Sequence, residues 1–291
     1  MIAGRSLITM ASCLALFLGM PAEGLAQQEE AFCVPVKTVR ESELAFKGGE
    51  KMHFTMHYEW GSINSDVGSA TVSLDTVVFN GQKAFRCVAQ GRTTRLFDLF
   101  FKVREDFRSW FTCDGLRPLK FTRDTHEGRY RATNSYLYRW NADEPFIAAD
   151  LYSTSAGQRS EQIPLTKCTF DLPSLFYFAR NIDWDNVEPG VKYPMTFAID
   201  EDIYNVYFIM YGRETIKVKG LGTVRTVRFA AKLLEGGVFT GEEDMRIWIS
   251  DDENRLPVYF EAPILVGLAT GRMNGYEGIK YPFTALVKPS R

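Results

Sequence analysis

The chain has 291 residues, of which 45% are hydrophobic and 14% are aromatic, so it is long and apolar enough to bury a sizeable core. The formal net charge of −2 at pH 7 argues against a general nucleic-acid-binding protein. Beyond the N-terminal segment, no apolar run approaches the length of a transmembrane helix.

The first 26 residues have the pattern of a signal peptide. Arg5 supplies a positive charge, Leu7–Met20 is apolar but too short to span a membrane, and Gly24-Leu25-Ala26 places small residues at a cleavage site. We therefore expect an exported chain that begins at Gln27 and contacts membranes at most peripherally. Two alternatives remain, a lipoprotein anchored through Cys13 and a retained N-terminal anchor.

Strands dominate the rest of the chain. Residues 27–49 are expected to form an extended lead-in. Lys51–Trp60 alternates apolar and polar side chains, which is typical of a half-buried strand. Asn80-Gly81 favours a tight hairpin turn between strands at Val67–Phe79 and Gln82–Thr93.

The next segment, Phe101–Thr112, alternates again and places Glu105 on an otherwise apolar face. Residues 153–162 are polar and are expected to form a loop. The remaining predicted strands are Leu116–Arg123, Arg129–Trp140, Phe146–Tyr152, Val191–Ile199, Ile203–Tyr211, Glu214–Leu221, Thr223–Leu234, Met245–Ser250, Arg255–Ala262, Ile264–Leu268 and Tyr281–Val287.

One helix is predicted, from Asp171 to Arg180. Asp171 is a favourable N-cap, and Pro173 lies in the first turn, where its missing N–H costs nothing. Arg180 lies near the C-terminus, where the helix dipole favours a cation.

About fourteen strands and one helix, joined by short turns, predict a mainly β fold. A sheet of this size must curl, split or close. We expect a large curved antiparallel sheet, or an open half-barrel, with the helix packed on its concave face. Residues 50–291 would form a single domain, although Glu188–Gly190 is an alternative midpoint between two halves.

Four cysteines follow the predicted cleavage site, and export would permit disulfides. Four cysteines allow three pairings, between which the sequence does not choose. We favour Cys87–Cys113, which flanks a predicted hairpin, and Cys33–Cys168, which would tie the lead-in to the middle of the chain.

Several segments together resemble domain-of-unknown-function family 3108 of exported Gram-negative proteins. They are AFKGGEKMHF at Ala45–Phe54, GSATV at Gly68–Val72, FFKVREDFRSW at Phe100–Trp110, LRPLKFTRDTHEGRY at Leu116–Tyr130 and WISDDENRLPVYFEAPILVG at Trp248–Gly267. The resemblance implies a β-rich protein of the cell envelope, in the periplasm or associated with the outer membrane. It brings no catalytic residues.

The usual catalytic and metal-binding signatures are weak or missing. There is no GxSxG, HExxH or P-loop sequence. His53 and His57 share a strand face but lie about 13 Å apart, too far for joint ligation of one metal. The acidic clusters Glu242–Asp244 and Asp251–Glu253 lie at opposite ends of one strand. We therefore predict no catalytic residue, no metal and no cofactor.

Glu105 is the most informative single residue, because an inward-facing carboxylate needs a partner or a shifted pKa. Arginines are available as partners, so an ion pair that holds the fold or grips a ligand is expected. Aromatic residues of 97–101 and 176–178 would gather where the helix meets the sheet, as core or as the lining of an apolar cavity. The predicted ligand-binding residues are Glu105, Arg104, Phe101, Phe107, Phe176 and Arg180.

We predict a non-enzymatic envelope protein that binds an apolar or amphiphilic ligand or assists envelope assembly. The alternative is a structural module that docks a protein or glycan partner, for which the basic and aromatic segment Leu116–Arg139 is a candidate surface. A glycan-active enzyme is the third reading, and it would need two carboxylates in one cleft. No nucleic-acid partner is expected.

Overall fold

The computed structural model describes residues 40–166, 168–233, 245–263 and 267–290, all within one compact unit, Phe32–Arg291. These residues form one helix, two short 3-10 turns and a sheet of sixteen strands. The elements are η1 Glu41–Glu43, β1 Glu50–Trp60, β2 Ile63–Phe79, β3 Gln82–Thr93, η2 Phe97–Leu99, β4 Val103–Thr112, β5 Pro118–Glu127, β6 Tyr130–Arg139, β7 Phe146–Ser153, β8 Gly157–Pro164, β9 Thr169–Phe170, α1 Leu172–Ala179, β10 Lys192–Ile199, β11 Asp202–Val218, β12 Gly222–Leu233, β13 Met245–Ser250, β14 Pro257–Pro263, β15 Leu268–Glu277 and β16 Leu286–Pro289.

The sheet consists of two meanders joined at β1. The strand order is β8-β7-β6-β5-β4-β3-β2-β1-β15-β14-β13-β12-β11-β10-β9, with β16 paired to β12. The end strands β8 and β9 do not pair with each other in the described chain, so the sheet stays open. The predicted curved, open antiparallel sheet is therefore confirmed, except that β9 and β10 pair in parallel.

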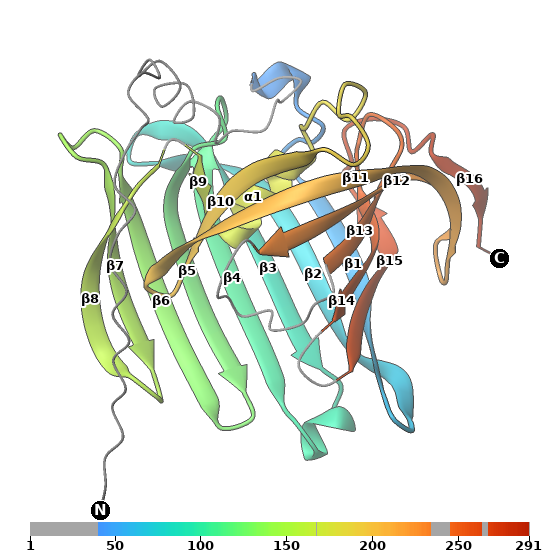
Figure 1. The fold of residues 1–291 in the computed structure, drawn as a ribbon, viewed down its shortest axis with the longest axis horizontal. Helices are drawn as coiled ribbons and strands as arrows, with labels where there is room; N and C mark the ends of the chain where they lie inside the picture. Colours follow the sequence, from blue (N-terminus) through green and yellow to red (C-terminus); the bar gives the residue numbers. More distant parts are fainter. Residues whose placement is uncertain (1–39, 167, 234–244, 264–266, 291) are drawn as a thin grey trace, which may run out of the picture. The chain divides into compact units, whose positions relative to one another are not determined.

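The sheet curls around α1. Figure 1 shows β10 and β11 passing across the concave side of β2–β5, with α1 between the two layers. The helix packs on β3 and β4 on one side and on β10 on the other. The sequence predicts this placement, and the predicted N-cap is confirmed: the Asp171 carboxylate accepts a hydrogen bond from the Ser174 backbone N–H at 2.9 Å.

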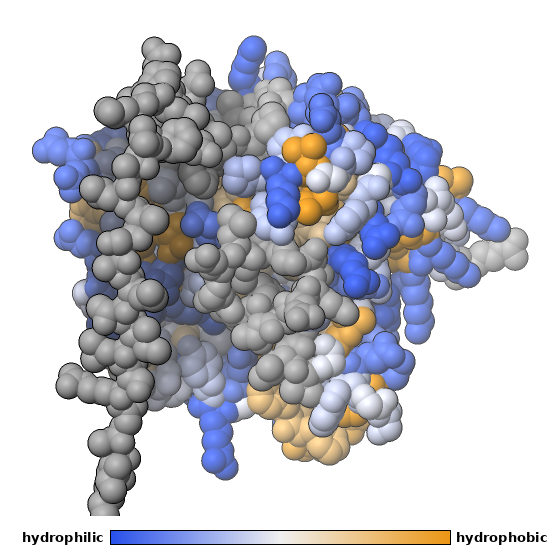
Figure 2. Space-filling view, viewed as in Figure 1, coloured by the Kyte–Doolittle hydropathy of each residue, from blue (hydrophilic) through white to orange (hydrophobic). Residues whose placement is uncertain are grey.

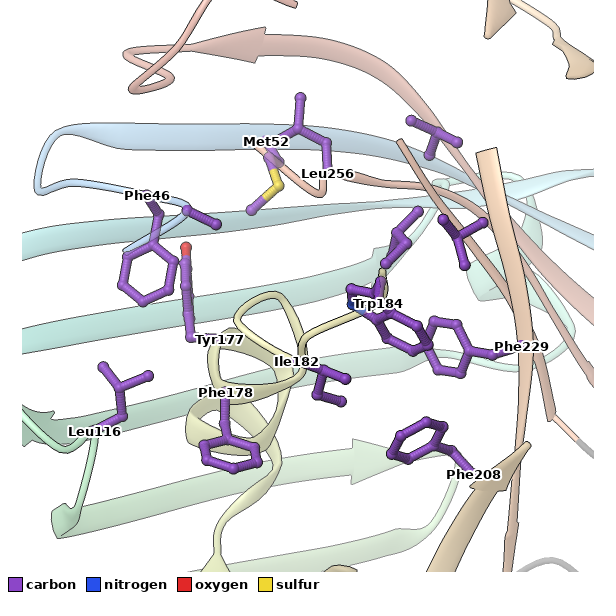
Figure 3. Close-up of a cluster of buried hydrophobic side chains, with 14 of the residues drawn as sticks. Phe46, Met52, Leu116, Tyr177, Phe178, Ile182, Trp184, Phe208, Phe229 and Leu256 are labelled. Carbon is purple, nitrogen blue, oxygen red and sulfur yellow. The ribbon is translucent and has the colours of Figure 1, made fainter. Parts of the chain in front are cut away.

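The core fills the concave side around the helix. Tyr177 points toward Phe46, with ring centroids 4.6 Å apart, and the tilted rings of Trp184 and Phe229 have centroids 4.7 Å apart (Figure 3). Phe46 and Leu44, in the segment expected to be part of the lead-in, are fully buried here. A second cluster joins β5–β8 to Ala198 of β10.

Several sequence predictions are wrong. The strands expected at Ile203–Tyr211 and Glu214–Leu221 form the single strand β11, and β15 occupies Leu268–Glu277, a stretch in which no strand is expected beyond Leu268. Residues 157–164 form the edge strand β8 rather than a loop. Cys87 and Cys113 are buried free thiols. The register explains this: Cys87 pairs with Ser109, so Cys113, four residues further along, lies roughly 13 Å away, beyond the ~7 Å that a disulfide spans. Cys33 lies outside the described residues, so the Cys33–Cys168 pair stays a prediction.

No helix of the described residues has the length and apolar character needed to cross a membrane.

Candidate functional site

The six predicted ligand-binding residues lie in three separate places. Phe176 and Arg180 belong to the helix and its C-cap. Phe101 and Arg104 lie at the far end of β4, where the chain arrives from η2. Glu105 and Phe107 lie on the concave face of β4, the face that also presents Ser109 to the helix. The structure therefore does not bring the six together.

Arg180 is fully engaged in a buried ion pair. Its Nη2 donates to Glu50 Oε2 at 2.9 Å and to the Asn254 carbonyl oxygen at 2.8 Å, and its guanidinium lies over the rings of Phe46 and Tyr177. Burial alone would lower the pKa of Arg180, but the Glu50 carboxylate more than offsets this and raises it. This pair joins the helix C-cap to β1 and leaves little of the guanidinium for a ligand.

Arg104 also has a local partner. Its Nη1 donates to Asp98 Oδ1 at 2.9 Å and to Thr93 Oγ1 at 3.1 Å. The guanidinium of Arg104 lowers the pKa of Asp98 to about 2. Arg104 thus fixes the connection between β3 and β4 and does not reach the concave face.

Glu105 is different, because only half of its carboxyl group is satisfied. Its Oε2 accepts a hydrogen bond from Thr125 Oγ1 at 2.6 Å, whereas its buried Oε1 has no hydrogen-bond partner. Burial raises the pKa of Glu105 to about 7, and the Glu127 carboxylate adds to this through its charge and through a side chain within hydrogen-bonding reach, while Thr125 and Arg123 act in the opposite direction. Near neutral pH the group can therefore donate or accept a hydrogen bond.

The concave face beside Glu105 has unfilled space. Gly91 lies directly opposite Glu105 on β3. A Cβ built on Gly91 would meet only the Glu105 side chain, at 3.6 and 4.0 Å. Phe107, Ala89 and Ala70, which lie on the same face, are only partly buried. We call this open stretch of the concave face, around Glu105 and Gly91, the Glu105 recess.

One side of the recess is bounded by the tip of the β10–β11 hairpin. Asp200 at this tip accepts hydrogen bonds from Arg123 Nη1 at 2.9 Å and Asn134 Nδ2 at 3.1 Å. Its carbonyl oxygen accepts from Tyr136 Oη at 2.5 Å. The sequence gives no sign of this contact, because its partners lie more than 60 residues apart along the chain.

A cavity of about 880 Å³ lies across β1–β6, and its lining includes Ala70, Gly91 and Glu105 of the Glu105 recess. By strand alternation, most of its lining side chains belong to the face opposite α1, among them His53, Arg92, Arg104, Asp106 and Asp124. Cations and anions are mixed along it. No group of three or more metal-ligating side chains exists among the described residues.

Comparison with known proteins identifies a family but no activity. A family model described as "Protein of unknown function (DUF3108)" matches residues 53–274. No curated protein matches the chain.

The solved structures that match this chain include the following two. One is a beta-barrel-like protein of domain-of-unknown-function family DUF1849 from Brucella abortus, with a TM-score of 0.52 and 8% identity over 85% of this chain and 100% of that one. This likeness supports the fold. The other, a candidate lipoprotein from Parabacteroides distasonis, is 9% identical over 81% of this chain and 99% of that one, and its TM-score of 0.31 is too low to support an argument.

Proposed function

The chain belongs to the DUF3108 family of proteins of unknown function, and from that premise we propose that it is a non-enzymatic, exported envelope protein that binds an amphiphilic ligand in the Glu105 recess. The single observation that carries the proposal is Glu105 Oε1, a buried carboxyl oxygen without a hydrogen-bond partner, on a side chain whose Cβ and Cγ lie beside the open position at Gly91. Buried polar atoms are nearly always paired, so an unpaired one beside a recess favours a ligand that completes the pair.

The surroundings indicate what such a ligand would look like. Phe107, Ala89 and Ala70 offer apolar, partly exposed surface, which favours an alkyl chain or another apolar body. The Glu105 carboxyl, with a pKa of about 7, favours a hydroxyl, amine or amide group at the end of that body. A strongly anionic head group would be repelled once Glu105 ionises.

A second candidate, a glycan-active enzyme, rests on Glu127. Its carboxylate lies near enough to Glu105 to raise the pKa of that residue, and a pair of neighbouring carboxyls is the machinery of glycoside hydrolysis. Release of reducing sugar from envelope glycans, abolished by Glu127→Gln, would favour this candidate over a carrier. A docking module for a protein or glycan remains the alternative if the recess binds no small molecule.

The first test identifies the ligand class. The protein is isolated from cells that produce it, and its mass is measured under native conditions and again after denaturation. We expect an additional non-covalent mass that is lost on denaturation and carries an acyl or comparable apolar group. A bare mass in every preparation would count against a carrier.

The second test fills the recess. Binding of N-phenyl-1-naphthylamine, a neutral apolar probe with one N–H donor, is followed by its fluorescence. We expect Gly91→Val to weaken binding roughly tenfold or more, because the added side chain occupies the space beside Glu105. Gly275→Val is the matched control. Gly275 lies in β15 on the sheet face away from the Glu105 recess, and a Cβ there meets His53 only at an ordinary 3.5 Å.

Glu105→Gln completes this test. If the carboxyl contacts the probe, binding changes with pH around 7 in the wild type and loses that dependence in Glu105→Gln. Binding that is unchanged in both Gly91→Val and Glu105→Gln would place the probe elsewhere and refute the proposal.

A further inference from the structure

The connection between β3 and β4 exposes an unusual concentration of large apolar side chains. Phe100 is 81% exposed, Leu99 is 79% exposed and Leu96 is 72% exposed. Figure 2 shows this apolar surface at the end of the sheet where Figure 1 draws the short turn between β3 and β4. We call these three residues, with Phe101 and the neighbouring exposed Trp60 and Ile63 of the β1–β2 turn, the apolar tip.

The exposure of the apolar tip is held in place by a polar framework beneath it. Asp98, between the apolar residues, binds Arg104 through Oδ1 at 2.9 Å and also accepts a hydrogen bond from Thr93. The ring of Phe97 packs against Tyr58 of β1, with centroids 6.5 Å apart. The loop is thus anchored through Asp98 and Phe97, and Leu99 and Phe100 are left facing outward.

Exposed cations surround the apolar tip. Arg95 and Lys102 bracket the segment, and both are exposed. Arg92 at the end of β3 and Arg129 in the β5–β6 turn are also exposed; the β5–β6 turn adjoins Phe101 through Gly128. None of these four cations forms an ion pair with another described residue. Two exposed acids, Glu59 and Glu127, lie at the same end, so the balance of charge is positive.

We infer that the apolar tip docks this protein onto an anionic phospholipid surface. Leu96, Leu99 and Phe100 would enter the interfacial layer, and the surrounding cations would contact phosphate groups. A lipid surface fits better than a protein partner for two reasons. The apolar residues lie at the exposed end of a short connection with cations around it, and they line no groove among the described residues. Trp60 beside them is a residue type enriched at membrane interfaces. The inference is independent of the Glu105 recess.

The test measures co-flotation of the purified protein, in the form its producing cells deliver, with two kinds of vesicle. One kind contains phosphatidylethanolamine and phosphatidylglycerol, and the other contains phosphatidylcholine alone. We expect binding to the anionic vesicles, weakened by salt. Leu99→Ser with Phe100→Ser should lower the partition coefficient roughly tenfold or more, since two large apolar side chains no longer enter the interface.

Matched variants separate the two contributions. Val78→Ser changes an equally exposed apolar residue, 77% accessible in β2, and should leave binding within about twofold of the wild type. Arg95→Gln with Lys102→Gln should weaken binding severalfold on anionic vesicles and leave binding to phosphatidylcholine unchanged.

Three outcomes would overturn the inference. They are absence of wild-type binding to anionic vesicles, equal binding by the Leu99→Ser, Phe100→Ser variant, and a concentration-dependent dimer that this variant abolishes while vesicles bind neither form. The last outcome would make a second copy of the chain the occupant of the apolar tip. Circular dichroism and thermal unfolding of each variant establish that the fold is retained.

Discussion

Two carboxylates on the concave side of the same sheet, Glu50 and Glu105, have opposite environments. Glu50 is 1% exposed and meets a guanidinium that is itself packed between aromatic rings and the Asn254 carbonyl. Glu105 has one hydroxyl partner, one unpaired oxygen and open space alongside. The comparison teaches that the Glu50 carboxylate, beside the helix, uses its hydrogen-bonding capacity to stabilise the fold. The Glu105 carboxyl, beside Gly91, keeps one oxygen available for a hydrogen bond.

Breaking the Glu50–Arg180 pair should give the largest effect on stability. Arg180→Met leaves the Glu50 carboxylate buried without its counter-ion, and we expect the free energy of unfolding to fall by about 3–5 kcal/mol. Chemical denaturation followed by tryptophan fluorescence measures this. The double variant Glu50→Leu, Arg180→Met should recover part of the loss, because it removes both charges. A loss under about 1 kcal/mol in Arg180→Met would show that the two regions do not differ as described.

The next effect concerns pH. The pKa of Glu105 is raised from 4.5 to about 7, so the folded chain binds this proton more tightly than the unfolded chain does. The corresponding stability is present below about pH 4.5 and is lost as the pH rises through 7, by up to about 3 kcal/mol in total. Unfolding measured from pH 5 to pH 8 should therefore show a steeper loss in the wild type than in Glu105→Gln.

Asp171 is a necessary reference for that experiment. Its pKa is also raised, to about 6, mainly by burial, and it acts in the same direction in both proteins. Only the difference between the two pH profiles reports on Glu105. Parallel profiles would mean that the Glu105 carboxyl is solvated and that the recess is not a distinct environment.

The smallest effect should come from Gly91→Ala. An alanine Cβ there makes only an ordinary contact at 3.6 Å, and the substitution restricts the unfolded chain, so we expect a gain of about 0.5 kcal/mol. Gly278→Ala is the contrasting control: its φ is +65°, and its Cβ would lie 2.1 Å from the Gly49 carbonyl oxygen, so it should destabilise. A destabilising Gly91→Ala would indicate that the recess is filled.

Much of this fold follows from local sequence patterns. Period-two alternation identifies most strands and puts Glu105 on the inner face, and Asp171 with Pro173 marks the start of α1. Strand β8 escapes this reasoning, because Arg159 and Glu161 occupy inward positions where an apolar residue would be expected. An edge strand has one unpaired side and tolerates such polar residues.

The candidate site is less predictable, because it depends on register and on distant partners. The sequence offers Arg180 as one possible partner for Glu105. The actual partner of Arg180 is Glu50, which lies 130 residues away along the chain. Register likewise separates Cys87 from Cys113. Nothing in the sequence marks Gly91 as important. Its role depends on the absence of other side chains from the space beside it, and this follows only from the three-dimensional structure.

The central position of β1 has a consequence for the order in which this chain acquires its structure. β1 pairs with β2 through a short turn, but its other neighbour is β15, where Lys51 meets Glu277. Strands β1–β8 can pair as successive local hairpins. Pairing of β1 with β15, in contrast, requires almost the whole polypeptide and closes a very long loop. Until that moment β1 is a bare edge, open to pairing with another chain. Strand β15, which pairs late, therefore covers the edge of β1, which forms early. We expect truncation before β15 to yield aggregates rather than a smaller soluble sheet.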